Sequence, residues 1–129
     1  MVTYMELMAR TTPRRQGRFD GLGLVLSGLC AVHCILGLVV VAGLGLTGGI
    51  LLDPAIHRVG LALATAFAAL AIGVGMMRHR RPVPLIVAST GLALMAAALA
   101  AGHGAHEAVL TVAGVLLVAA GHVLNLRMA

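Results

Sequence analysis

The chain has 129 residues, of which 60% are hydrophobic and 10% charged, its formal net charge is +5, and its mean hydropathy is +1.06. A soluble domain is about one quarter charged, so this composition excludes the water-soluble classes, and with them a basic nucleic-acid-binding surface. A transmembrane β-barrel would alternate apolar and polar residues between aromatic girdles, whereas these apolar runs are unbroken and only 2% of the residues are aromatic, which leaves an α-helical protein of the lipid bilayer.

The amino-terminal part of the chain divides into a polar segment and a long apolar one. Residues 1–20 are basic, and Pro13 and Gly17 discourage a long helix, so we expect a flexible basic cytoplasmic tail. The apolar stretch that follows is longer than the roughly 7–15 residues of a signal-peptide core, and it has no convincing cleavage site. It predicts a retained first span over about 21–46.

Three more apolar stretches follow, and a bilayer span needs about 20 residues. Asp53 followed by Pro54 is typical of a helix start, because Asp caps the first turn and Pro suits the first helical position. The predicted spans lie at about 54–77, 83–101 and 108–126. Residues 21–127 therefore form one domain, an all-α integral membrane bundle of four helices.

The arginines predict the orientation of this bundle. With a cytoplasmic amino terminus, one side of the membrane holds all but one of the nine basic residues, and the other side holds only Arg58. The cytoplasmic set is Arg10, Arg14, Arg15, Arg18, Arg78, Arg80, Arg81 and Arg127. This asymmetry places both termini in the cytoplasm, and the short connections favour antiparallel neighbours. Small residues four apart, Ala62/Ala66 and Ala69/Gly73, are expected to let helices approach closely.

The densest group of chemically active residues lies in the first span. Cys30, His33 and Cys34 have i, i+3 and i+4 spacing, so their side chains share one helical face. Thiolates are soft ligands that select ions such as copper(I), zinc and mercury(II). A buried free cysteine is otherwise a small hydrophobic residue. A pair of thiols also suits a membrane-embedded redox or sensor protein, and an accessory protein whose polar groups only hold helices together is a further alternative, so these interpretations stay open.

Three further polar residues are candidates because ionisable groups in a membrane span are costly. His57 and Glu107 lie at the outer ends of the second and fourth spans, where they are expected to receive a cation. His122, near the inner end of the fourth span, is expected to be a polar step toward the cytoplasm. The alternatives are helix-dipole stabilisation for Glu107 and interhelical hydrogen bonding for His122. His79, among the arginines, is expected to be a solvated loop residue.

Three phrases carry a resemblance to a known family. They are L-S-G-L-C-A-V-H-C-I at 26–35, D-P-A-I-H at 53–57 and H-E-A-V-L-T-V-A-G-V-L-L-V-A-A-G-H-V-L-N-L-R at 106–127. Together they resemble the MerC family of mercuric transport proteins, over nearly all of residues 20–127. The type members carry C-A-A-C in the first span, so His33 is an addition here.

The resemblance implies a multi-pass protein of the bacterial inner membrane that carries Hg(II) inward on Cys30 and Cys34. The metal-site candidates are then Cys30, His33, Cys34, His57, Glu107 and His122. The added imidazole extends the transported ion to Zn(II), Cd(II) or Cu(I) as alternatives. The implied partners are the bilayer, the ion, a periplasmic metal donor and a cytoplasmic thiol acceptor, with no permanent cofactor. No nucleophile with a nearby base is found, so no enzymatic activity is expected.

Overall fold

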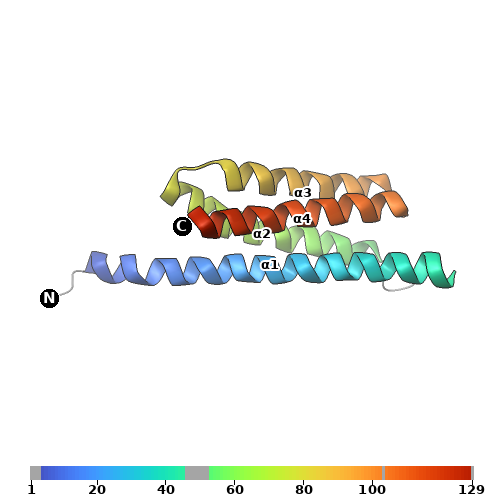
Figure 1. The fold of residues 1–129 in the computed structure, drawn as a ribbon, viewed down its shortest axis with the longest axis horizontal. Coiled ribbons are helices and arrows are strands. Elements are labelled where there is room, and N and C mark those ends of the chain that lie inside the picture. Colours follow the sequence, from blue (N-terminus) through green and yellow to red (C-terminus); the bar gives the residue numbers. More distant parts are fainter. Residues whose placement is uncertain (1–3, 46–52, 103, 129) are drawn as a thin grey trace.

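The computed structural model describes residues 4–45, 53–102 and 104–128. Within these ranges the regular structure is entirely α-helical: α1 (Tyr4–Leu44), α2 (Pro54–His79), α3 (Val83–Ala101) and α4 (Ala105–Met128). Each helix is long and apolar enough to span a membrane. Successive helices run antiparallel, so the start of α1 and the end of α4 lie toward the same end of the bundle (Figure 1). The predicted four-helix membrane architecture is confirmed.

The ends of α2 follow from local chemistry. The Asp53 side chain accepts a hydrogen bond of 2.9 Å from the backbone N–H of Ala55, and Pro54 occupies the first turn, as predicted. At the other end Arg80 takes the left-handed conformation, with φ of 53°, and its N–H donates to the Met76 carbonyl over 2.8 Å. We call the two ends of the bundle the Asp53 end and the Arg80 end.

The largest departure from the prediction is in α1. The helix begins at Tyr4 rather than near Gly21, so residues 4–20 are helical and not a flexible tail. Pro13 lacks an N–H and therefore removes one backbone hydrogen bond, but the bonds on either side of it continue the helix. Asp20, which the prediction assigned to the tail, is completely buried in the bundle. The helix ends at Leu44, two residues before the predicted limit of the span.

Helices α3 and α4 approach each other most closely at glycines. A Cβ atom on Gly91 would lie 2.5 Å from the carbonyl oxygen of Gly114, and a Cβ atom on Gly114 would lie 2.6 Å from that of Gly91. Farther along α4, a Cβ atom on Gly121 would lie 2.8 Å from Ala88 Cβ. These positions have no room for a larger side chain, so the two backbones are in direct contact.

The small residues singled out in α2 are not the ones that pack. Ala62, Ala66 and Ala69 are exposed, whereas the buried residues of α2 are Ala64, Ala68, Ala71, Ile72 and Gly75. In a helix this rich in alanine, pairs of small residues four apart occur on every face. The spacing therefore does not identify the face that contacts another helix, and this part of the packing prediction is wrong.

Candidate metal site

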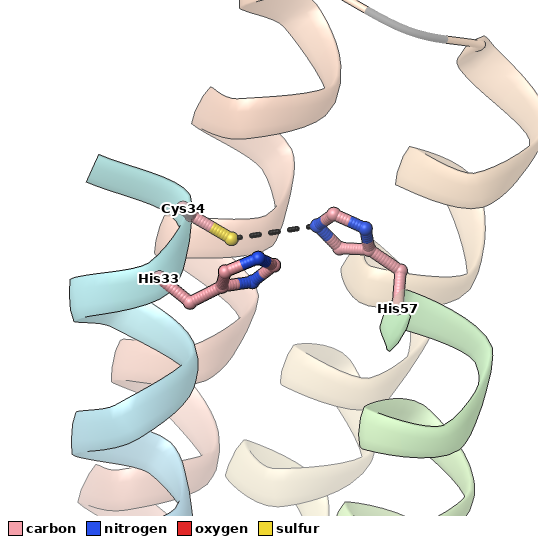
Figure 2. Close-up of side chains that lie close together, drawn as sticks. All are labelled: His33, Cys34 and His57. Carbon is pink, nitrogen blue, oxygen red and sulfur yellow. Dashed lines mark hydrogen bonds between the residues drawn. The ribbon is translucent and has the colours of Figure 1, made fainter. Parts of the chain in front are cut away.

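Three predicted candidates lie together near the Asp53 end of the bundle. His33 and Cys34 of α1 point toward His57, in the first turn of α2 (Figure 2). The metal-ligating atoms of these three residues all lie within 4.8 Å of one another. Cys34 Sγ is 3.6 Å from His57 Nε2, and the two imidazole rings are 5.5 Å apart between centroids, inclined at 42°. The group thus joins two helices through one thiol and two imidazoles.

The spacing of these atoms fits coordination of a small cation. With Zn–S bonds of about 2.3 Å and Zn–N bonds of about 2.0–2.1 Å, a tetrahedral site separates sulfur from nitrogen by roughly 3.6 Å. The observed separation of Cys34 Sγ and His57 Nε2 is also 3.6 Å. Three donors leave one position of a tetrahedral ion open, as expected where a ligand must be exchanged.

Glu107, in the first turn of α4, extends the group to a third helix. Its Oε1 atom lies 3.6 Å from Nδ1 of His57, which is beyond hydrogen-bonding distance, and this buried nitrogen has no hydrogen-bond partner among the residues that the structure describes. Metal-bound histidines usually donate their second N–H to a carboxylate, which fixes the tautomer and the orientation of the ring. Glu107 thus faces the Nδ1 side of the His57 ring, while Nε2 faces Cys34 Sγ.

A cavity of about 350 Å³ opens beside these residues. His33, Cys34, His57 and Glu107 are part of its wall, and the remainder is apolar. Its other lining residues are Gly37, Leu38, Ala42, Gly104, Ala105 and Ala108. The cavity therefore leaves room for a cation directly beside the ligand atoms of His33, Cys34 and His57.

Cys30 lies outside this group. It faces α2 one helical turn farther from the Asp53 end, about 6 Å along the axis from Cys34. A Cβ atom on Gly60 would lie 3.6 Å from Cys30 Sγ, and the cysteine packs against the apolar cluster that contains Ala64 and Met95. Both cysteines are free thiols. Of the predicted stripe, the structure brings His33 and Cys34 to His57, while Cys30 occupies a packing position.

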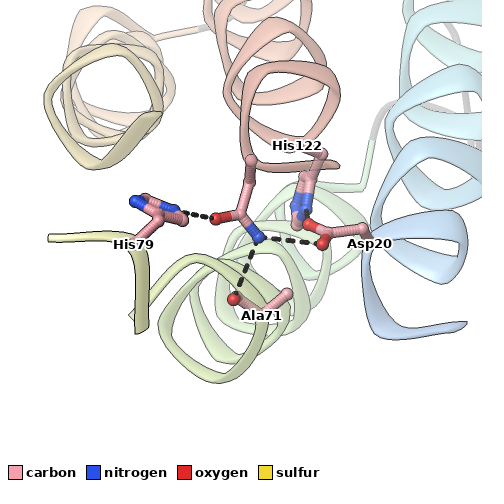
Figure 3. Close-up of polar contacts among 5 residues, drawn as sticks. Asp20, Ala71, His79 and His122 are labelled. Atoms are coloured by element: carbon pink, nitrogen blue, oxygen red, sulfur yellow. Dashed lines mark hydrogen bonds and ion pairs between the residues drawn. The ribbon is translucent and has the colours of Figure 1, made fainter. Parts of the chain in front are cut away.

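His122 belongs to a separate polar network near the Arg80 end (Figure 3). Its Nδ1 atom is 2.7 Å from Asp20 Oδ1. The Asn125 amide donates to Asp20 Oδ2 over 2.8 Å and to the Ala71 carbonyl over 3.1 Å. The side chains of Asp20, His122 and Asn125 are all inaccessible to solvent. The structure thus joins α1, α2 and α4 through one hydrogen-bonded network.

The sequence does not predict two members of this network, His79 and Asp20. His79 is half-buried rather than a solvated loop residue, and its Nε2–H donates to Asn125 Oδ1 over 3.0 Å. Asp20 precedes the apolar run, so the sequence predicts it in the tail, whereas it is buried. The sequence does contain one signal for the burial of Asp20, because this acidic residue directly adjoins the apolar run at the edge of the first span. Its partners are about 100 positions away in the sequence, and that separation hid the pairing.

Comparison with known proteins supports a single assignment. The family model described as MerC mercury resistance protein matches residues 20–127. None of the curated proteins or solved structures compared with the chain matches it. The matched region contains both polar groups, from Asp20 at its start to Asn125 near its end.

Proposed function

Since the chain belongs to the MerC family, whose model covers residues 20–127, we propose that it carries a soft metal cation across the bacterial inner membrane. The proposed ligands are His33, Cys34 and His57. The observation that supports this most strongly is the convergence of their ligand atoms within 4.8 Å. Transport of mercury is the activity that the family suggests, and Hg(II) is the first candidate for the cargo.

The donor set also favours a second group of cargo ions. A single thiolate binds Hg(II), but two imidazoles beside it suit Zn(II), Cd(II) and Cu(I) as well. Cys30 packs against Gly60 and the apolar cluster and is not among the converging donors. The arrangement therefore supports a mixed nitrogen and sulfur site more than a pair of thiols, and more than a thiol redox centre.

Because the ligands come from two helices, the ion would hold α1 against α2 while it is bound. A change in the distance between His57 and Cys34 would then weaken binding and release the ion. We propose that a donor loads the site from the periplasmic side, at the Asp53 end, and that a cytoplasmic thiol accepts the ion near the Arg80 end. The driving force for release is the higher affinity of the acceptor thiol.

This direction depends on the orientation of the bundle. The arginines of the Arg80 end outnumber those of the Asp53 end, where Arg58 stands alone, so the Arg80 end is proposed to face the cytoplasm. We expect a reporter enzyme that works only in the cytoplasm to be active when it is fused after Ala129. A reporter enzyme that works only in the periplasm is expected to be inactive at the same position. A periplasmic signal from that fusion would reverse the proposed direction.

The function is tested by metal uptake into vesicles that contain the purified protein. Hg(II), Cd(II), Zn(II) and Cu(I) are offered separately, and the metal inside is measured after external metal is removed by a chelator. Uptake above that of protein-free vesicles is expected for at least one of these ions. If none of them enters faster than it enters protein-free vesicles, the protein is not a carrier of soft cations.

Replacing Glu107 by Gln tests how the site is supported. The variant keeps the size of the side chain but removes the negative charge that lies 3.6 Å from His57 Nδ1. Loss of such a supporting carboxylate typically lowers metal affinity about 10–100-fold, and we expect a loss in this range. Metal titration of the detergent-solubilised protein provides the measurement.

Asp53→Asn is the matched control for that titration. It removes an equal negative charge at the same end of the bundle, and asparagine still caps the helix. Asp53 is exposed and contacts the Ala55 N–H rather than the metal ligands. Equal losses in the two variants would show that Glu107 acts through general electrostatics instead of through His57.

A further inference from the structure

The network around Asp20 and His122 has no part in the metal site, although it contains the most deeply buried ionisable pair that the structure describes. Both residues have a relative exposure of 0%. They come from different helices, α1 and α4, and their side chains meet at 2.7 Å, as expected for a hydrogen bond that involves a charged group. Ionisable residues placed in this way within membrane proteins often bind protons.

The hydrogen bonds restrict where a proton can be added or removed. Asp20 Oδ2 accepts from the Asn125 amide and Asp20 Oδ1 lies 2.7 Å from His122 Nδ1, so both carboxyl oxygens are already engaged. At the other side of the imidazole, Nε2 of His122 is buried and makes no hydrogen bond in the described part of the chain. This atom can exist with or without a proton while the two contacts of Asp20 stay intact.

The charges near the pair come mostly from exposed groups. On α2, His79 reaches the network through Asn125, and its Nδ1 accepts from the backbone N–H of Arg81 over 3.1 Å. Helix α3 has no ionisable residue. The remaining ionisable groups of this end whose side chains are described are the exposed Arg18, Arg78, Arg80, Arg81 and Arg127. Among the described ionisable groups of the Arg80 end, only Asp20 and His122 are thus fully buried.

The position of Nε2 connects proton exchange to a movement of α1. The His122 ring lies directly against Gly23 of α1, in a space that the Cβ atom of any other residue would occupy. Because the ring is buried, separation of α1 from α4 at Gly23 would expose Nε2 to water. The same helix carries His33 and Cys34, so a movement that exposes His122 also acts on the metal ligands.

We propose that Asp20 and His122 form a proton-binding site that locks α1 against α4. With a proton on both nitrogens of His122, the pair is an imidazolium and a carboxylate with no net charge, and α1 stays closed. When α1 separates at Gly23, Nε2 gives its proton to water at the Arg80 end. The pair is then left with a net negative charge, which disfavours closure in the membrane interior until a proton returns.

The proton site is tested first in the metal-free protein, without reliance on transport. Histidine labelled with ¹⁵N reports the protonation of each ring nitrogen by NMR, and the His122 signals are those missing from His122→Gln. We expect one pH-dependent step in which His122 gains a proton on Nε2. Asp20→Asn removes the partner charge and is expected to abolish the step, whereas Asp53→Asn leaves it unchanged. A His122 signal that does not change over the pH range of the folded protein would overturn the proposal.

A second measurement covers the case in which Asp20→Asn fails to fold. The chain has two aspartates, Asp20 and Asp53, so Asp53→Asn labelled with ¹³C in the aspartate carboxyl reports Asp20 alone. The infrared band of this carboxylate is expected to shift in the same pH step as His122 while keeping the frequency range of an ionised group. A band that shows no shift in that step would contradict the shared site.

Coupling between proton movement and metal transport rests on the proposed function and is measured separately. In vesicles with a trapped pH indicator, metal uptake by the parent protein is expected to be accompanied by proton movement, and Asp20→Asn is expected to lose the proton movement. Metal uptake by the parent with no proton movement would refute coupling. Absence of all metal uptake would refute the proposed function and the coupling together, and the NMR step would still decide the proton site.

Discussion

Replacement of Cys34 by Ser is expected to abolish metal binding and uptake, whereas the same replacement of Cys30 leaves most of both. Cys34 is the only thiol among the converging donors, and a hydroxyl is a poor ligand for soft cations. Loss of a supporting residue costs about 10–100-fold in affinity, so loss of the thiolate ligand itself should exceed about 100-fold. Elemental analysis of the metal-exposed, detergent-purified proteins measures the difference.

Cys30→Ser is a close control, because it makes the same chemical change on the same helix, one turn away. Its side chain packs beside Gly60 and the apolar cluster, so the replacement mainly tests packing. Circular dichroism of both variants confirms that the bundle has formed. If the two serine variants lose metal equally, the ion is bound by a pair of thiols. If a folded Cys34→Ser binds and transports as the parent does, the proposed site is wrong.

The sequence predicts the helices well because their signals are local. The Asp53 and Pro54 start is determined by adjacent residues, and the third span was predicted with the limits that α3 shows, Val83–Ala101. The failure in α1 has a local cause too. Pro13 predicts a break in the helix, but the loss of one hydrogen bond does not stop a helix that continues into an apolar span.

The site was less predictable because it depends on how helices are rotated against each other. The spacing of Cys30, His33 and Cys34 puts them on one face of α1, but which part of that face meets α2 depends on the packing of the whole bundle. The sequence predicts His57 in an outer layer separate from the thiols, whereas its Nε2 lies 3.6 Å from Cys34 Sγ. The contact of Asp20 with His122 likewise needs the arrangement of α1 and α4.

The glycines at the contact of α3 and α4 give the second large expected effect. Gly114→Ala places a methyl group 2.6 Å from the Gly91 carbonyl oxygen and 2.7 Å from Met95 Cγ. The first of these neighbours is backbone, so the helices have to move apart and lose contacts along their length. Overpacking of this kind costs about 1–3 kcal/mol of unfolding free energy. The chain has no tryptophan and only three other aromatic residues, so circular dichroism in mixed detergent micelles is the appropriate measurement.

Gly73→Ala is the matched control, since a Cβ atom there would meet nothing within 4 Å. In the interior of a helix, exchange of glycine for alanine stabilises by about 0.5–1 kcal/mol when the new methyl group meets no neighbour. The two variants are therefore expected to shift the unfolding midpoint in opposite directions, although the chemical change is identical. If Gly114→Ala is as stable as Gly73→Ala, the backbones of α3 and α4 are not in contact.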